Sequence, residues 1–419
     1  MTKLIFTALA PNTQWDDVWL ALRLICAPWR WRRGEAVAAL EAQFRAWLPA
    51  QHAYACVSGR SGLYAILKAL ALPPETEVLL QAYTCVAVPD PILWAGAKPV
   101  YVDCEVETFN MLPEDLERKI TPRARVVIVQ HTFGLPANLD ALLTIARKHG
   151  LFVIEDCAHA LGATYHGQRV GTFGDAAFFS FGRDKVISSV FGGLVVTSDN
   201  VVAQRIKNTQ QGWKYPSGWW TFQQLLHPLI TAKAKFLWRV FGLGKLILAI
   251  AKICHLTSKA VYGLEKSGGK PSFIEKRLPN ALAQLTLHQF KKLEKFNAHR
   301  RKIADVYNTQ LLKNPHLISP LSRGRTRGSY DGHIYLRYTM LTPKATQILA
   351  AAKQQNIFLG DWYRTPIAPE GVDYGAVGYT LGSCPVAEKL ARESVNLPTD
   401  IHIGEQEVNR IVVFLTHFG

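Results

Sequence analysis

Residues 152–160 read Phe-Val-Ile-Glu-Asp-Cys-Ala-His-Ala, an apolar run that leads directly into two carboxylates. The run is long enough for a buried strand, and a helical pattern, Asn138 to Gly150, precedes it. Similar pairs of short apolar runs and longer helical patterns fill residues 35–200. This alternation predicts an α/β fold with a mainly parallel sheet that helices cover. Such sheets bind ligands at the carboxyl ends of their strands, where Asp156 is expected to lie.

The same reasoning predicts the other elements. We predict strands at Tyr54 to Val57, Glu77 to Gln81, Lys98 to Asp103, Val126 to Gln130 and Phe152 to Asp156. We predict helices at Glu35 to Leu48, Gly62 to Leu72, Thr84 to Ala95 and Asn138 to Gly150. Leu282 to Leu312 reads as one long amphipathic helix, and Tyr335 to Phe418 as a smaller α+β domain. The predicted domains are a large domain (1–212), a helical insert (213–276) and a long helix with a small C-terminal domain (277–419).

Composition and charge restrict the class of protein. The 419 residues are 48% hydrophobic and 19% charged, which excludes a disordered or fibrous chain. The formal net charge of +16 favours an anionic partner: nucleic acid, a lipid surface or a phosphorylated substrate. Seven cysteines without a Cys-x-x-Cys pair indicate neither a zinc site nor a disulfide framework, and no metal is predicted. Their odd number, and the lack of a signal-peptide pattern in residues 1–11, favour a cytoplasmic protein.

A second stretch, residues 174–185, reads Gly-Asp-Ala-Ala-Phe-Phe-Ser-Phe-Gly-Arg-Asp-Lys. An apolar strand would end at Ser180, whose hydroxyl could bind a phosphate oxygen. Lys185 would follow as a nucleophile if the neighbouring Arg183 lowered its pKa. Taken alone, Lys185 also fits a solvated surface lysine, and Asp156 also fits an ordinary acidic loop.

A third stretch, residues 57–63, reads Val-Ser-Gly-Arg-Ser-Gly-Leu and lies between a predicted strand and a predicted helix. Small residues there would let the backbone approach a phosphate, which the free N–H groups at the start of the helix would bind. Arg60 could add a positive charge. Any glycine-rich turn between a strand and a helix fits this description, so the motif is weak by itself.

The three stretches, with Tyr83-Thr84 between the third and the first, resemble the DegT/DnrJ-type sugar aminotransferases. These are pyridoxal 5′-phosphate (PLP) enzymes of the aspartate aminotransferase fold, fold type I. The resemblance covers roughly residues 34–200 and 277–419. It implies a large PLP-dependent transferase domain and a smaller C-terminal domain, with the helical insert between them.

The resemblance also implies roles for single residues. Lys185 would bind PLP covalently and act as the catalytic base, and Asp156 would hold the proton on the pyridine nitrogen. The cofactor's phosphate would be bound by Ser58, Gly59, Arg60, Ser61 and Ser180. His159 stands where the family usually has glutamine, near the ring oxygen. Cys85 stands where an aromatic residue usually stacks on the ring.

Three further positions differ from the family pattern. Val190-Phe191-Gly192-Gly193 replaces Gly-Glu-Gly-Gly, and Pro366-Ile367-Ala368 replaces Pro-Leu-His. Glu275 replaces an asparagine that reaches the phosphate of the neighbouring subunit. These differences leave the PLP chemistry in place, and they leave open whether the substrate is a soluble nucleotide sugar.

The implied reaction transfers an amino group, with glutamate as the donor, to a keto-sugar in glycan or polysaccharide biosynthesis. The implied assembly is a homodimer with its sites at the subunit interface. A PLP-dependent sugar dehydratase of the same fold is an alternative, but those relatives have histidine in place of Lys185. A membrane-docked, non-catalytic scaffold is a second alternative, which the retention of Asp156, Ser180 and Lys185 argues against.

The predicted insert has a composition of its own. Residues 201–264 contain no Asp or Glu but nine basic residues: Arg205, Lys207, Lys214, Lys233, Lys235, Arg239, Lys245, Lys252 and Lys259. The last three are seven residues apart, so one helix would present them on one stripe. The apolar run Leu246 to Ile253 would cover the remaining faces of that helix, and Gly242 and Gly244 could divide it.

This combination predicts a helix that lies on an anionic membrane surface, with residues 213–270 as the contact. The protein would be peripheral at the inner face of the membrane, because no apolar stretch is long enough to span it. The alternative is a helical element that packs between subunits with its lysines solvated. Nucleic acid is not expected as a partner, because no nucleic-acid-binding module is recognisable.

Overall fold

A seven-stranded sheet forms the centre of the computed structural model, which describes residues 4–311 and 332–418. Its strands lie in the order β2-β11-β10-β7-β6-β3-β5. Their bounds are β2 (His52–Cys56), β3 (Glu77–Gln81), β5 (Lys98–Val102), β6 (Ala124–Gln130), β7 (Phe152–Asp156), β10 (Ala176–Ser180) and β11 (Gly193–Thr197). All run parallel except β11, which is antiparallel to both of its neighbours. The predicted mainly parallel sheet is confirmed.

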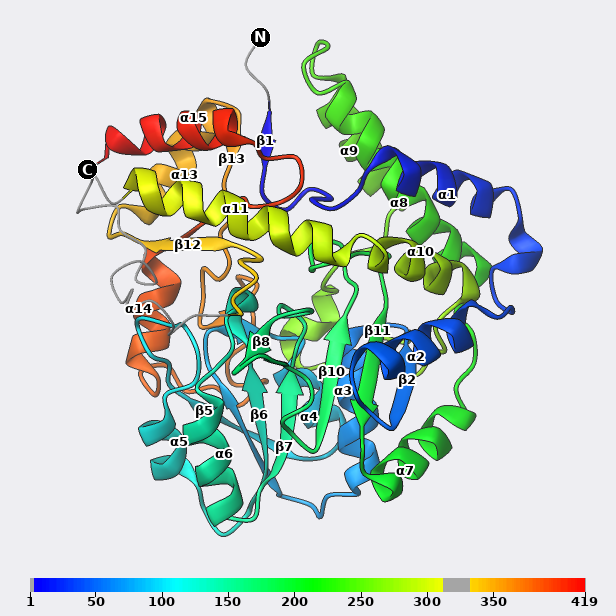
Figure 1. Cartoon of the computed structure of the whole chain (residues 1–419), viewed down its shortest axis with the longest axis vertical. Helices are drawn as coiled ribbons and strands as arrows, with labels where there is room; N and C mark the ends of the chain where they lie inside the picture. The colour runs from blue at the N-terminus through cyan, green and yellow to red at the C-terminus, as the bar shows by residue number, and fades with distance from the viewer. Residues whose placement is uncertain (1–3, 312–331, 419) are drawn as a thin grey trace.

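Helices cover this sheet, so its central strands are buried. Residues Val126 to Val129 of β6 are at most 1% exposed, which accounts for the continuous apolar run there. The covering helices are α2 (Ala36–Trp47), α3 (Gly59–Leu70), α4 (Pro89–Trp94), α5 (Pro113–Lys119), α6 (Leu139–Lys148) and α7 (Asn200–Gln211). Helices α5 and α6 pack together near the β5 edge, and α7 packs near the β2 edge (Figure 1).

A smaller domain has a hydrophobic core of its own, built from both ends of the chain. Its elements are α11 (Leu293–Leu311), β12 (Tyr338–Leu341), α13 (Ala345–Gln354), β13 (Ile357–Phe358), α14 (Pro385–Glu393), β15 (Ser394–Leu397) and α15 (Glu405–Thr416). Near the N-terminus, β1 (Ile5–Phe6) pairs in parallel with β13. The predicted α+β character of the C-terminal part is therefore confirmed, and the N-terminal segment joins it.

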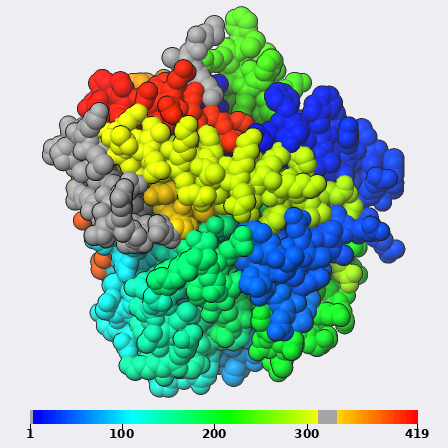
Figure 2. Space-filling view, in the orientation of Figure 1, coloured from blue at the N-terminus to red at the C-terminus, as the bar shows by residue number. Residues whose placement is uncertain are grey.

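The predicted insert forms a helical extension whose two ends meet, because Lys214 and Lys276 form an isolated β-bridge. It contains α8 (Gly218–Phe236), α9 (Leu243–Ile253) and the short helix η3 (Gly263–Ser267). Helix α8 packs on α1 (Trp15–Ile25) and α10 (Asn280–Phe290), whereas α9 packs on α8 and projects from the top of the molecule (Figures 1 and 2). Among the described residues, every helix is too short or too polar to cross a membrane.

Three predicted helical features differ in the structure. The helix predicted over Leu282 to Leu312 is two helices, because the chain turns at 291–292 and buries both Phe290 and Leu293; Leu312 lies outside the described residues. The helix predicted from Thr84 to Ala95 begins only at Pro89, since proline favours the first turn of a helix, and a short strand, β4 (Thr84–Cys85), precedes it. Lys259 lies beyond the end of α9, so the predicted stripe of three lysines on one helix is wrong for Lys259.

Candidate active site

Strand ends meet at one edge of the sheet and bring the predicted site residues together. Strands β7 and β10 run parallel, so Asp156 and Ser180 lie at the same edge. Ser180 pairs with Gly193 of β11, and Gly193 pairs with Cys56 at the end of β2. The turn between β2 and α3 therefore lies beside Ser180. The three stretches that the sequence singled out converge, as expected for the carboxyl edge of a parallel sheet.

Lys185 lies in the loop between β10 and β11 and contacts His159. Lys185 Nζ is 2.9 Å from His159 Nε2. Burial lowers the pKa of His159 well below its usual value, and the positive charges of Lys185 and Arg337 lower it further. This favours the neutral imidazole, and with Lys185 as the donor Nε2 accepts the hydrogen bond and the ring proton is assigned to Nδ1. His159 Nδ1 is buried and has no hydrogen-bond partner among the described residues, which leaves one donor for a ligand.

The two carboxylates at the end of β7 have different surroundings. Glu155 accepts hydrogen bonds from the backbone N–H groups of 171, 173 and 174, so it holds the following loop in place. Asp156 accepts one backbone hydrogen bond, from Ala158 at 2.9 Å, and it has no ion pair within the described residues. Burial raises the pKa of Asp156, while the Ala158 N–H and the charge of Lys185 oppose that rise. Asp156 is thus the carboxyl that can bind a cationic group of a ligand.

The turn after β2 is a cradle for a small anion at the start of α3. Ser58 caps this helix, because its Oγ accepts a hydrogen bond from the Ser61 N–H at 3.1 Å. A β-carbon on Gly59 would lie 2.8 Å from the Ser180 Cβ, and one on Gly193 would lie 2.4 Å from the Ser58 carbonyl carbon. Glycine is therefore required at both positions, because the turn packs directly against Ser180 and β11 at the start of α3, where free N–H groups could bind a phosphate.

The helical extension borders this turn through two arginines. The Arg60 guanidinium pairs with the buried carboxylate of Glu265 and donates to the Ala260 carbonyl. Arg183 donates to Ser258 Oγ at 2.7 Å. Arg60 thus ties the predicted phosphate turn to the extension, and a contact between Arg60 and a phosphate stays a prediction.

Aromatic rings gather around His159 rather than at Cys85. Cys85 pairs with Ala368 of β14 (Ile367–Ala368). Its side chain is a thiol and cannot stack on the ring of a cofactor. The ring of Phe133 stacks on His159 at 5.8 Å and 8°, and that of Trp362 at 5.4 Å and 16°. Lys185 Nζ lies 5.1 Å from the centre of the Trp362 ring. Trp362 was not among the residues predicted from the sequence, although the pair Trp362-Tyr363 was an available signal.

Arg337 is a second residue that the sequence analysis missed. Its side chain is 2% exposed, lies 5.1 Å from the centre of the Trp362 ring, and donates to the Leu336 and Asp184 carbonyls. It forms no ion pair within the described residues. A cavity of about 210 Å³ lies beside Arg337. Thr7 lines this cavity, and its buried Oγ1 has no hydrogen-bond partner among the described residues. A buried cation beside a cavity fits the anionic group of a small ligand.

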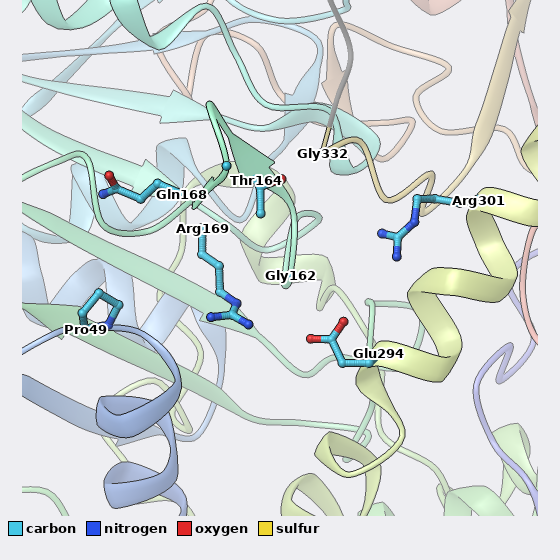
Figure 3. A pocket seen from close by; sticks show the side chains of 9 residues that line it. Pro49, Gly162, Thr164, Gln168, Arg169, Glu294, Arg301 and Gly332 are labelled. Carbon is cyan, nitrogen blue, oxygen red and sulfur yellow. The ribbon is translucent and has the colours of Figure 1, made fainter. Parts of the chain in front are cut away.

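A larger pocket of about 560 Å³ lies elsewhere, between the large domain and α11. Its lining includes Arg169, Glu294 and Arg301, and it contains none of the predicted site residues (Figure 3). The Arg169 guanidinium donates to the Trp47 carbonyl and stacks on the Trp47 ring. The pocket therefore lacks the nucleophile, the buried carboxyl and the anion cradle that the sheet edge combines.

Comparisons with known proteins identify the family to which the chain belongs. The sequence profile of the DegT/DnrJ/EryC1/StrS aminotransferase family matches residues 21–225 and 251–416. The "pleiotropic regulatory protein" of Geobacillus stearothermophilus is 29% identical over 391 residues, which cover 92% of this chain and 91% of that protein. The UDP-N-acetyl-3-dehydro-alpha-D-glucosamine 3-aminotransferase of Acidithiobacillus ferrooxidans is 28% identical over 380 residues, 90% of this chain and 87% of that one.

Solved structures share the fold over almost the whole chain. PseC of Helicobacter pylori, an aminotransferase involved in the biosynthesis of pseudoaminic acid, has a TM-score of 0.76 at 18% identity and 99% coverage of both chains. The GDP-4-keto-6-deoxy-D-mannose-3-dehydratase of Escherichia coli has a TM-score of 0.74 at 18% identity, over 98% of this chain and 100% of that one. An aminotransferase and a dehydratase thus both have this fold, so the fold alone does not distinguish the two reactions.

Proposed function

Since the chain belongs to the DegT/DnrJ/EryC1/StrS aminotransferase family and is a PLP-dependent enzyme, we propose that it transfers an amino group from glutamate to a keto-sugar in glycan or polysaccharide biosynthesis. The observation that carries this proposal is the position of Lys185, whose amine contacts a neutral His159 beside the buried Asp156. A dehydratase reaction is less well supported, because Lys185 stands where those relatives have histidine.

The residues at the sheet edge fit PLP in three respects. Asp156 is a buried carboxyl that can bind the protonated pyridine nitrogen. His159 Nδ1 is a buried donor without a partner, suited to the ring oxygen. The turn at Ser58 forms the start of α3 and lies directly against Ser180, a position suited to the phosphate. When bound, PLP supplies an electron sink that stabilises negative charge on the carbon that gains or loses a proton.

The chain's own groups would then divide the work. Ser58, Gly59, Ser61 and Ser180 would bind the phosphate through backbone N–H groups and hydroxyls. A phosphate contact of the Arg60 side chain would require its guanidinium to leave Glu265. The Lys185 amine would hold the cofactor covalently and later carry a proton between its Nζ and the reacting carbon. Asp156 would keep the pyridine nitrogen protonated. His159 would orient Lys185 through Nε2, and the surrounding rings would exclude water.

Arg337 supports glutamate as the amino donor. It is a buried cation without an ion pair in the described chain, and it shares the Trp362 ring with Lys185. We infer that Arg337 binds a carboxylate of the donor, since a guanidinium binds a carboxylate with two parallel hydrogen bonds. For the acceptor, the support is the family and relatives named as sugar aminotransferases.

Two further parts of the proposal concern assembly and location. We propose a homodimer, for which the support is family membership. Sedimentation of the active enzyme tests this, and a fully active monomer would contradict it. We also propose that the enzyme works at an anionic membrane surface, an attachment that a separate part of the chain would supply.

The cofactor assignment is tested by reduction of the purified enzyme with borohydride, followed by peptide mass spectrometry. We expect pyridoxyl phosphate on the peptide that contains Lys185 and on no other. Lys185→Ala should lose this label and the conversion of glutamate to 2-oxoglutarate, while Lys68→Ala, at an exposed lysine of α3, should keep both. A label on a different lysine, or turnover by Lys185→Ala at the rate of the unmodified enzyme, would refute the assignment.

A further inference from the structure

Exposed apolar side chains are concentrated at the end of the helical extension. Seven large apolar residues between 236 and 253 are exposed: Phe236, Val240, Phe241, Leu243, Leu246, Ile250 and Ile253. Phe241 is 99% exposed, and Phe236 and Ile253 are 76% and 75% exposed. We call residues 236–253 the apolar tip. Contiguous exposed apolar surface of this kind marks an interaction site.

The apolar tip is held by close packing, so its exposed face has a fixed shape. A β-carbon on Gly244 would lie 2.1 Å from the Ala234 carbonyl oxygen, so α9 approaches the backbone of α8 directly. At the base of the tip, the Trp238 ring contacts the rings of Phe6 and Phe358 at 4.9 and 5.5 Å. These contacts bury the inner side of the tip and leave its apolar outer side uncovered.

The exposed positions on α9 follow helical spacing. Leu243, Leu246, Ile250 and Ile253 are separated by three, four and three residues, so they lie on one face. Ala251, on the other side, is 3% exposed. Phe241 precedes this face at the turn between α8 and α9. The tip is therefore an amphipathic hairpin whose apolar face is exposed, and α9 projects from the top of the molecule (Figures 1 and 2).

Exposed basic residues share the tip with this face, and acidic residues are absent from the segment. Arg239, Lys245 and Lys252 are exposed in the tip, and residues 201–264 contain no Asp or Glu. A second copy of the tip is therefore a poor partner, because two such surfaces would bring like charges together with no carboxylate to pair them. A bilayer with anionic lipids fits this face better than a second copy does, because it has negatively charged head groups and an apolar interior.

The apolar tip also lies mostly outside the part of the chain that carries the family's common features. The family profile matches residues 21–225 and 251–416, so residues 226–250 fall between the two matched parts. The aminotransferase reaction therefore does not account for the exposed face. Helix α9 has 11 residues, about half of the roughly 20 that a membrane-spanning helix needs, so the tip is suited to lie on a bilayer rather than to cross it.

We propose that the apolar tip docks on a membrane surface that contains anionic lipid. Phe236, Phe241 and the exposed face of α9 enter the boundary between head groups and acyl chains, while Arg239, Lys245 and Lys252 lie at the lipid phosphates. Each cation near such a surface strengthens binding by about fivefold, and the apolar side chains prevent release at moderate salt. This inference does not rest on the proposed enzymatic function, because attachment can be measured without turnover.

The test is flotation of the full-length, PLP-loaded protein with lipid vesicles. One vesicle type contains phosphatidylcholine only, and the other also contains phosphatidylglycerol. We expect binding to the second type, weakened but not abolished by added salt. Failure of the unmodified protein to bind phosphatidylglycerol vesicles at low salt would overturn the proposal.

Two pairs of variants localise the contact. The triple change Arg239→Glu, Lys245→Glu and Lys252→Glu should reduce binding by about a hundredfold or more. The control triple Lys291→Glu, Lys295→Glu and Lys353→Glu changes net charge equally at exposed positions elsewhere and should have a small effect. Equal loss in both triples would show that overall charge, and not the tip, is responsible, which would overturn the proposal.

The second pair tests the apolar contribution. Phe241→Ser with Ile253→Ser should weaken vesicle binding by at least about tenfold, whereas Leu381→Ser with Val413→Ser, at other exposed apolar positions, should leave it unchanged. Unchanged binding by the tip variant would contradict insertion. If the tip variant instead altered only the sedimentation of the protein, the face would be a contact between copies and the membrane proposal would be wrong.

Discussion

The candidate active site and the apolar tip place their charges in opposite surroundings. In the site, Asp156, His159 and Arg337 are each at most 4% exposed, so burial and fixed neighbours determine their charge states. In the tip, Arg239 and Lys245 are exposed, with no acidic residue nearby in the sequence. Buried charges can select one small ligand in one orientation, whereas exposed charges attract an extended surface and are screened by salt. We infer that the chain recognises two kinds of anion, a bound cofactor with its substrate and a surface, by these two different means.

Among the tests of the candidate active site, Asp156→Asn should have the largest effect. A neutral amide cannot keep a ring nitrogen protonated, so we expect the conversion of glutamate to 2-oxoglutarate to fall by about a hundredfold to a thousandfold. The rate of this half-reaction measures the change, and circular dichroism checks the fold. Vesicle binding should stay the same, because Asp156 and the apolar tip are separate. An unchanged half-reaction would remove Asp156 from the site, and a change in vesicle binding would contradict the independence of the two regions.

Arg337→Leu should have the next largest effect, and the effect should be selective. Loss of a buried cation that pairs with a substrate carboxylate costs about 2 kcal/mol or more, which corresponds to about a thirtyfold rise in KM for glutamate. The value of kcat should change much less, because Arg337 is not assigned to proton transfer. Steady-state kinetics with glutamate as the varied substrate separate the two parameters.

Two comparisons strengthen this test of Arg337. Arg337→Lys keeps the charge and should restore part of the affinity for glutamate. The KM for an amine donor that has no carboxylate should not respond to either change. If Arg337→Leu lowered kcat with KM unaltered, Arg337 would belong to the reaction step rather than to donor binding.

The sequence predicted where the candidate site residues converge better than it predicted the details of the extension. Asp156 and Ser180 stand at the ends of apolar strands, with Lys185 in the loop after Ser180, and the register of a parallel sheet brings such ends together whatever lies between them. The contact of Arg60 with Glu265 could not be predicted, because 205 residues separate the two and no periodicity relates them. Arg337 was missed for a related reason: only tertiary packing turns a lone arginine into a buried cation.

In the extension, the charge composition of the sequence does not determine where the helices end or how they pack. Its charge composition predicted an interaction surface, but composition carries no information on where a helix ends. Gly242 adopts a left-handed conformation at the start of α9, with φ of 72°, and α9 ends at Ile253, so Lys259 leaves the predicted stripe. The exposed apolar face depends on how α9 packs on α8, which the close approach at Gly244 determines.

A third prediction concerns pH and a buried neutral histidine near the site. Burial lowers the pKa of His333 from 6.5 to about 3. The unfolded chain therefore binds a proton below pH 6.5 that the folded protein does not bind, so this histidine makes the free energy of unfolding fall as pH decreases below 6.5. Between pH 7 and pH 5 its contribution to that decrease is about 2 kcal/mol.

His333→Asn tests this linkage. Asparagine can still accept the hydrogen bond that His333 Nδ1 accepts from the Tyr335 N–H at 3.1 Å, but it does not titrate. Urea unfolding at pH 7 and at pH 5 should show a smaller loss of stability in this variant, by about 2 kcal/mol. An identical pH dependence in His333→Asn and the unmodified protein would show that His333 is charged in the folded state.

The smallest expected effect comes from Gly244→Ala. This change should affect the apolar tip and leave the candidate active site unaltered. Alanine usually favours a helix over glycine by up to about 1 kcal/mol, but here its methyl group would lie 2.1 Å from the Ala234 carbonyl oxygen. The clash should exceed the gain and destabilise the packing of α9 on α8 by about 1 to 3 kcal/mol. Because α9 packs on α8 and not on the sheet, the loss should be local.

We therefore expect faster amide hydrogen exchange in residues 243–253 of Gly244→Ala and vesicle binding weaker by about fivefold, with the glutamate half-reaction unaltered. Gly212→Ala is the matched control, since a β-carbon there meets no atom within 4 Å, and it should change none of the three measurements. If Gly244→Ala slowed the half-reaction as much as it weakened vesicle binding, the extension would be coupled to the site. Arg60 with Glu265, and Arg183 with Ser258, would be the contacts that transmit the change, because they join the extension to the turn beside Ser180.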